Sequence, residues 1–157
     1  MVSPSESRVL ERTQNDEWYM RIVILGCSRL GAQLAIRLDA KEHQVTVLDR
    51  DAAAFARLGA DFKGQRVVGD GLDTDVLLEA GVSEADAFVA CTAGDNRNLT
   101  ACQFARELFG VEKVISRVSD PLRGQIYAEM GLLTVSPTVF GADLLHDALV
   151  NGTPVRA

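Results

Sequence analysis

Short apolar runs alternate with helix-type segments along most of this chain, and this alternation constrains the fold more than any other feature. Six runs rich in apolar and β-branched residues are predicted as strands, at residues 21–26, 44–49, 65–70, 87–92, 113–119 and 133–137. Each run is followed by a segment with the apolar spacing of a helix. The runs are apolar throughout rather than alternating, which is typical of parallel strands covered on both faces.

Connections between parallel strands are right-handed, and the simplest arrangement of six such units is a doubly wound sheet. We therefore predict an α/β fold with a six-stranded parallel sheet in the order 3-2-1-4-5-6. The 157 residues suffice for a single domain. Residues 1–19 are polar and are expected to form a flexible N-terminal arm. Residues 20–150 then form the domain, and residues 151–157 form a C-terminal tail.

The segment between the first predicted strand and helix has the outline of the phosphate-binding turn G-x-G-x-x-G, because Gly26 and Gly31 stand at its two ends. Gly26 permits the tight turn that Cys27 continues, and Gly31 lets the helix pack close to the strand. The helix would begin at Arg29 and Leu30, whose free backbone N–H groups suit a phosphate. The segment therefore predicts a Rossmann-like nucleotide site.

Ser28 departs from the motif, because a glycine usually stands at its position. Its Cβ hinders the close approach of a dinucleotide, whereas its hydroxyl adds a hydrogen-bond donor. The sequence is compatible with two interpretations of this turn. Either the turn binds an adenine nucleotide of a kind that the sequence does not fix, or it is a turn of this type that binds no ligand.

An acid at the end of the second predicted strand supports the nucleotide reading. Asp49 follows Gly31 by 18 residues, close to the spacing of a carboxylate that binds ribose hydroxyls. Asp51 is the better candidate to cap the next helix, which leaves Asp49 for a ligand. A carboxylate here repels a 2′-phosphate and so disfavours NADP, and Arg50 softens that exclusion without reversing it.

Other candidate ligand contacts lie at neighbouring strand ends, because ligands of such sheets bind outside the carboxyl ends of the strands. They are Asp70 and Gly71 after the third strand, Cys91 and Thr92 at the end of the fourth, and Arg117 on the fifth. Arg117 either reaches a phosphate or pairs with a surface acid. Asn98 is expected to hold the loop after the fourth strand by hydrogen bonds rather than to touch a ligand.

Catalytic and metal-binding patterns are not recognised in the sequence. His43 and His146 occupy positions typical of surface histidines, and the three cysteines lack metal-ligand spacing. A net charge of −6 argues against a nucleic-acid partner. We therefore expect no catalytic residues, no metal site and no enzyme activity. A small NAD-dependent oxidoreductase is the alternative.

Three further motifs carry a resemblance to a known family. They are the Gly-Asp pair that ends in Asp70, the D-x-x-N pattern from Asp95 to Asn98, and the run Ser-Arg-Val-Ser-Asp-Pro at 116–121. With them, the chain from Met20 to about Leu149 resembles the nucleotide-binding N-terminal domain of Trk-type potassium-uptake regulators. This domain is also called the N-domain of RCK (regulator of potassium conductance) proteins.

The resemblance implies a cytoplasmic regulatory subunit on the inner face of the cell membrane. Such a subunit binds NAD(H), AMP, ADP or ATP in its cleft and gates a potassium-translocating membrane subunit. The implied ligand contacts are Gly26, Cys27, Ser28, Arg29, Leu30, Asp49, Asp70, Gly71, Cys91, Thr92 and Arg117. Arg29 would match an arginine that can reach a neighbouring subunit's phosphate.

The last predicted helix carries an apolar stripe formed by Phe140, Leu144, Leu145, Ala148 and Leu149. This stripe either packs on the chain's own sheet or joins two copies. The family uses a helix here for assembly, which implies a homodimer or a larger ring. The family's C-terminal ligand-binding subdomain has no counterpart in the chain, so either the chain is truncated or it works with a separate RCK-type partner.

Overall fold

Six parallel strands form one sheet at the centre of the molecule. The computed structural model describes residues 19–152, and the expected arm and tail lie almost wholly outside them. The strands are β1 (Arg21–Leu25), β2 (Gln44–Asp49), β3 (Gln65–Val68), β4 (Ala87–Ala90), β5 (Lys113–Arg117) and β6 (Leu133–Val135). They lie in the order β3-β2-β1-β4-β5-β6 and every neighbouring pair is parallel. The predicted fold class and strand order are confirmed.

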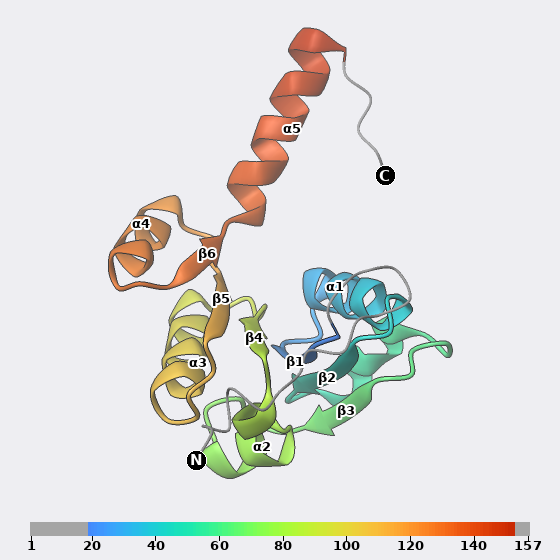
Figure 1. Cartoon of the computed structure of the whole chain (residues 1–157). Helices are drawn as coiled ribbons and strands as arrows, with labels where there is room; N and C mark the ends of the chain where they lie inside the picture. Colours follow the sequence, from blue (N-terminus) through green and yellow to red (C-terminus); the bar gives the residue numbers. More distant parts are fainter. Residues whose placement is uncertain (1–18, 153–157) are drawn as a thin grey trace.

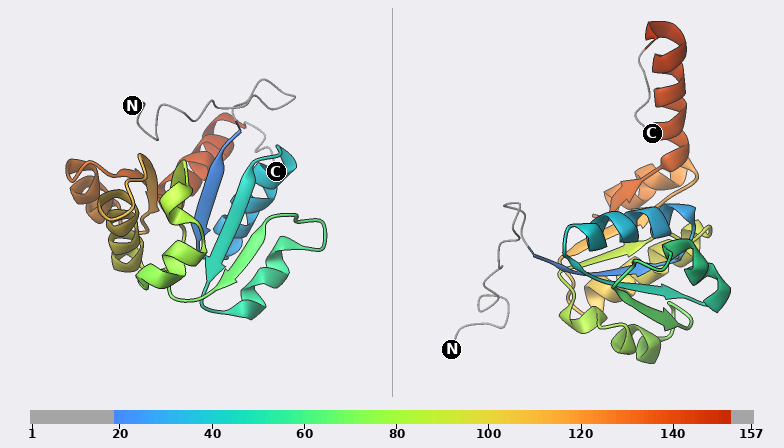
Figure 2. Two further views of the ribbon diagram at one scale, coloured as in Figure 1. Left: turned by 60° about the horizontal axis from the view of Figure 1, so that its bottom comes forward. Right: turned by 90° about the vertical axis from the view of Figure 1, so that its right-hand side faces the viewer.

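Helices flank the two faces of the sheet (Figures 1 and 2). One face carries α1 (Arg29–Ala40) and the 3₁₀ helix η1 (Ala52–Leu58). The other carries α2 (Thr74–Glu79), the 3₁₀ helix η2 (Val82–Glu84), α3 (Asp95–Glu107) and α4 (Pro121–Glu129). The last helix, α5, spans Pro137–Asn151.

Two apolar cores hold these layers together, because alternate residues of a strand point to opposite faces. Ile22 and Ile24 of β1 belong to the core under α1, whereas Val23 and Leu25 belong to the core under α2 and α3. All four side chains are buried. Burial of each such side chain stabilises the folded state by roughly 1.5–3 kcal/mol. The central strands therefore contribute strongly to the stability of the fold.

The outer strands are less covered than the sequence suggests. In β3 and β6, most positions are exposed or half-buried, in contrast to the fully apolar and covered strands that were predicted. Leu133 is 60% exposed, and it pairs in register with Ile115 on the face that carries α1. β6 is uncovered on this face because α1 and η1 pack over the β1–β2–β3 side of the sheet and α5 does not pack on the sheet.

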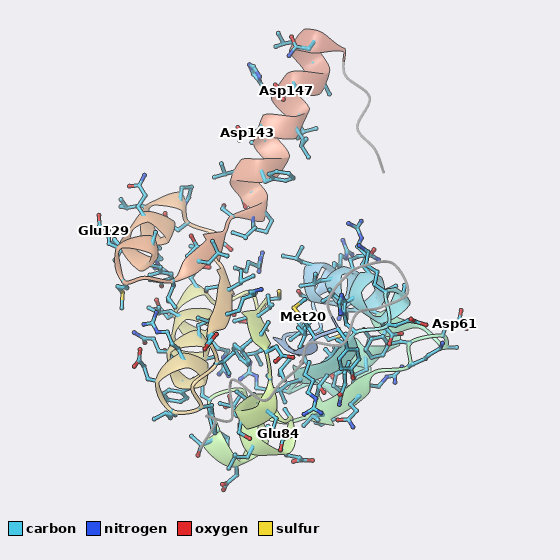
Figure 3. All side chains as sticks on the ribbon, viewed as in Figure 1. Met20, Asp61, Glu84, Glu129, Asp143 and Asp147 are labelled. Atoms are coloured by element: carbon cyan, nitrogen blue, oxygen red, sulfur yellow. The ribbon has the colours of Figure 1, made fainter. Side chains whose placement is uncertain are left out.

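Helix α5 leaves the body of the domain (Figures 1 and 2). None of its residues is buried, and Phe140 and Leu145 are each 65% exposed. Figure 3 shows Asp143 and Asp147 on this helix, well clear of the sheet. The interpretation that the stripe packs on its own sheet is therefore wrong. Association of two copies stays a prediction.

Within residues 19–152, no helix combines the length and the apolar character that crossing a bilayer requires.

Two glycines bring the start of α1 against the ends of β1 and β4. Gly26 has φ of +98°, and a Cβ on it would lie 2.8 Å from the Thr92 nitrogen. A Cβ on Gly31 would lie 2.0 Å from the carbonyl oxygen of Gly26. Backbone atoms cannot yield as side chains can, so both positions require glycine.

The contact at Gly31 gives a stability prediction. Replacing Gly31 by alanine should lower the free energy of unfolding by about 2 kcal/mol or more, because the added methyl group overlaps backbone. Gly124→Ala in α4 is the matched control, since its Cβ would meet its nearest atom at 3.8 Å. Urea denaturation of the three proteins measures the difference. Equal stability of the two variants would contradict the close approach.

Candidate functional site

The turn from β1 into α1 is closed by the hydroxyl group of Ser28. Ser28 Oγ accepts a hydrogen bond from the Gly31 N–H at 3.1 Å and donates one to the Cys91 carbonyl at 2.9 Å. The side chain thus caps α1 and ties the turn to the end of β4. The serine that breaks the glycine motif therefore has a structural role, and its oxygen points into the protein.

The first turn of α1 leaves two backbone donors without a partner among the described residues. Ser28 takes the N–H of Gly31, and the Ala32 N–H donates to the Ser28 carbonyl at 2.8 Å. The N–H groups of Arg29 and Leu30 have no such partner among the described residues. Both residues are exposed, so these donors open to solvent at the positive end of the helix.

Asp49 lies beside this turn at the end of β2. One carboxylate oxygen accepts the Cys27 N–H at 2.7 Å and the other accepts the Asp51 N–H at 2.8 Å. Arg57 donates to the Cys27 carbonyl at 3.1 Å, so both backbone polar groups of Cys27 are paired. Asp49 is half-buried, and each of its oxygens has a further lone pair with which to accept from a ribose hydroxyl. As predicted, Asp51 is the residue that caps η1.

Asp70 follows β3 and forms an ion pair that the sequence did not predict. Its Oδ1 accepts from the Leu72 N–H at 3.0 Å and from the Arg97 guanidinium of α3. The Leu72 hydrogen bond, helped by Arg97, lowers the pKa of Asp70. A Cβ on Gly71 would lie 2.4 Å from the Leu25 side chain, so this segment is pressed against the end of β1.

The loop after β4 is held by Asn98, as the sequence predicts. This side chain is fully buried. Its Oδ1 accepts from the Thr92 N–H at 3.0 Å and from the Thr92 hydroxyl at 2.6 Å. Its Nδ2 donates to the carbonyls of Thr92 and Arg117, at 2.9 and 3.1 Å.

Asp95 holds the start of α3 in the same way that Asn98 holds the loop. It is 7% exposed, and its carboxylate accepts the N–H groups of Ser119 and Asp120. Asp95 therefore joins the start of α3 to the loop after β5, and Asn98, one helical turn later, joins the loop after β4 to the end of β5.

Arg117 contacts the loop after β4 rather than a surface acid. One terminal nitrogen donates to the Thr92 carbonyl at 2.8 Å. Its Nε is buried and has no hydrogen-bond partner among the described residues. An unpaired buried donor is costly, and Nε is a donor that the described residues leave unsatisfied.

The predicted contacts thus lie at the carboxyl ends of five neighbouring strands, β3, β2, β1, β4 and β5. The turn at 26–31, Asp49, Cys91 and Thr92 are joined by direct hydrogen bonds or by the glycine contacts. Arg50 is exposed and close enough to affect the pKa of Asp70. Sequence reasoning missed Arg57 and Arg97, because nothing in their spacing along the chain shows which strand end they face.

Cys27 and Cys91, the cysteines at these strand ends, are buried and stay protonated as thiols. Burial raises the pKa of the Cys91 thiol to about 11 and also raises the pKa of Cys27. No thiolate is available from either side chain near neutral pH. Among the described residues, no group of His, Cys, Asp and Glu side chains could hold a metal ion.

Comparison with known proteins assigns the family. The model of the TrkA-N domain matches residues 22–137, which cover the sheet, the glycine turn and the start of α5. The chain belongs to the TrkA-N domain family. This confirms the resemblance drawn from the Gly-Asp, D-x-x-N and Ser-Arg-Val-Ser-Asp-Pro motifs.

Among named relatives, the Trk system potassium uptake protein TrkA of Streptomyces coelicolor is 49% identical over 134 residues. The match covers 85% of this chain and 60% of the relative, so it spans less than two thirds of the length of that protein. A TrkA homolog of Methanothermobacter thermautotrophicus is 34% identical over 113 residues, which are 72% of this chain and 52% of that protein.

Solved structures show the same fold at low identity. The Kef CTD of Shewanella denitrificans, in AMP-bound form, aligns with a TM-score of 0.73 at 21% identity and covers 85% of this chain and 82% of its own. The GsuK channel bound to NAD aligns with a TM-score of 0.62 at 23% identity, over 83% of this chain and 24% of its own.

Proposed function

We propose that this chain is the nucleotide-sensing regulatory domain of a Trk-type potassium-uptake system. The observation that carries the proposal is the juxtaposition at the carboxyl edge of the sheet. The N–H groups of Arg29 and Leu30 at the start of α1 have no hydrogen-bond partner within residues 19–152, and Asp49 is bound to the same turn through the Cys27 N–H. This is the arrangement that holds a phosphate and a ribose at the switch point of a doubly wound sheet.

An adenine nucleotide is the proposed ligand, as NAD(H), AMP, ADP or ATP. The Kef and GsuK structures contain AMP and NAD, respectively. Asp49 would accept hydrogen bonds from ribose hydroxyls and repel a 2′-phosphate. The start of α1 and Arg117 would bind phosphate, while Ser28, whose hydroxyl is turned inward, would set how closely the phosphate approaches.

A chain of hydrogen bonds leads from this opening to α5 and supports a regulatory role. Asn98 connects Thr92 with Arg117, and the next residue, Val118, donates to the Val135 carbonyl at 2.9 Å. Ser136 follows directly and caps α5. A ligand that moves the Thr92 loop would therefore act on the base of the helix that leaves the domain.

The exposed stripe of α5 is the proposed assembly surface. Phe140, Leu144, Leu145 and Leu149 are all at least 40% exposed, and Leu133 and Val135 of β6 are bare at the base of the helix. A second copy of this chain would cover both, in a homodimer or a larger ring. A nucleotide would then bias the potassium-translocating subunit by binding one arrangement of the paired domains better than another.

The proposed place of action follows from the relatives named Trk system potassium uptake protein. The domain would sit at the cytoplasmic face of the membrane, against the potassium-translocating subunit, with a separate RCK-type chain as a further proposed partner. It would act by binding and not by catalysis.

Nucleotide binding can be tested with the purified chain. NAD, AMP, ADP or ATP at about 100 times its dissociation constant should stabilise the fold by about 2.7 kcal/mol. NADP should give a smaller melting shift than NAD, because its 2′-phosphate meets Asp49. NADH should stay unoxidised with a panel of aldehydes and ketones. Absence of any shift contradicts the proposal, and turnover of NADH would favour the oxidoreductase.

Assembly through α5 gives a second prediction. Leu145→Asp places a charge in the stripe and should convert the assembly to monomers in light-scattering chromatography, because burial of a charge without a partner is unfavourable. His146→Asp is the matched control, since it adds an acid at the next position, whose side chain is 72% exposed and lies outside the stripe. If both variants keep the wild-type mass, α5 is not the contact.

A further inference from the structure

The ion pair between Arg97 and Asp70 joins two sides of the candidate site. Asp70 follows β3, whereas Arg97 belongs to the first turn of α3, which follows β4. The Arg97 side chain is 26% exposed and the Asp70 side chain 47%, so the pair is partly open to solvent. It connects segments that are 27 residues apart in the sequence.

Both ends of this pair are held by neighbouring contacts. On the α3 side, Asp95 and Asn98 flank Arg97 and are fixed by hydrogen bonds to the ends of β4 and β5. On the β3 side, the Leu72 N–H holds Asp70 and Gly71 is packed against Leu25. Arg97 is therefore presented from a rigid platform and meets a carboxylate whose loop is also fixed.

The two oxygens of Asp70 differ in their contacts. Oδ1 accepts from both the Leu72 N–H and Arg97. Oδ2 has no partner among the residues that the structure describes, and half of the side chain remains open to solvent. A carboxylate oxygen can only accept, so this free oxygen is matched to a donor group on a ligand.

The place of Asp70 beside Asp49 indicates which part of a ligand it would meet. The two residues follow the neighbouring strands β2 and β3, and the Gly69 N–H donates to the Asp49 carbonyl at 3.0 Å. With the phosphate at the start of α1 and the ribose at Asp49, the base continues outward, toward β3 and Asp70. The donor at the edge of adenine is its exocyclic amino group.

We propose that Arg97 is a positioning residue that sets base specificity: it holds Oδ1 of Asp70 so that Oδ2 accepts a hydrogen bond from the amino group of adenine. The inference rests on the proposed nucleotide-binding function and deepens it. Arg97 itself makes no hydrogen bond to the base. Its removal frees the carboxylate to rotate, and the preference for an amino-bearing purine is lost.

The test compares AMP with purine riboside 5′-monophosphate, which lacks the exocyclic amino group, by calorimetry on the full chain. The wild-type protein should bind AMP about tenfold more tightly or better, the scale of one hydrogen bond to a charged group. In Arg97→Met, AMP affinity should fall and the ratio should approach one, while affinity for the analogue stays the same. Arg97→Lys should restore part of the ratio.

Arg106→Met is the matched control, because it removes one arginine from the same helix at the end away from the opening, with a side chain that is 30% exposed. It should keep the wild-type ratio. An unchanged ratio in Arg97→Met, or an equal loss for both ligands, would overturn the positioning role and leave the proposed function intact. If the wild-type chain binds neither ligand nor any other adenine nucleotide, the proposed function fails as well.

Discussion

The contact between Gly31 and the carbonyl oxygen of Gly26 is the constraint on which the rest of the site depends. It sets α1 against the turn so closely that no side chain fits between them. The Ser28 hydroxyl can then reach the Cys91 carbonyl, and the Cys27 N–H can reach Asp49. One close approach thus brings the ends of β1, β2 and β4 together, and it leaves the first donors of α1 open.

The same frame explains how an acidic chain could attract a phosphate. The net charge is −6, yet Arg29, Arg97 and Arg117 lie at or near the starts of α1 and α3 and the end of β5. The acids at this edge, Asp49, Asp70 and Asp95, all accept backbone N–H groups. Their charge is therefore partly balanced locally. Arg97 is paired with Asp70, so the start of α1 with Arg29, and Arg117, are the positive groups proposed for a phosphate.

The fold was predictable from the sequence because hydrophobic period and strand count determine a doubly wound sheet almost alone. The hydrogen bonds of Asn98 to the Thr92 loop and the cap at Asp51 were predictable as well, since both join residues at most six positions apart, whereas the contact of Asn98 with Arg117 was not. The partners of Arg97 and Arg57 were not, because they depend on which strand ends become neighbours. The direction of α5 could not be predicted either, since an apolar stripe does not reveal whether its own sheet or another copy covers it.

Amide chemical-shift mapping during titration with AMP tests the central claim most directly, that the start of α1 and Asp49 together hold an adenosine phosphate. The account predicts that the N–H signals of Arg29 and Leu30 shift most, followed by those of residues 49–51 and 70–72. His43 and Lys63 lie at the opposite edge, formed by the amino ends of the strands, and their N–H signals should stay unchanged. Saturable shifts at that opposite edge, with none at Arg29 or Leu30, would contradict it.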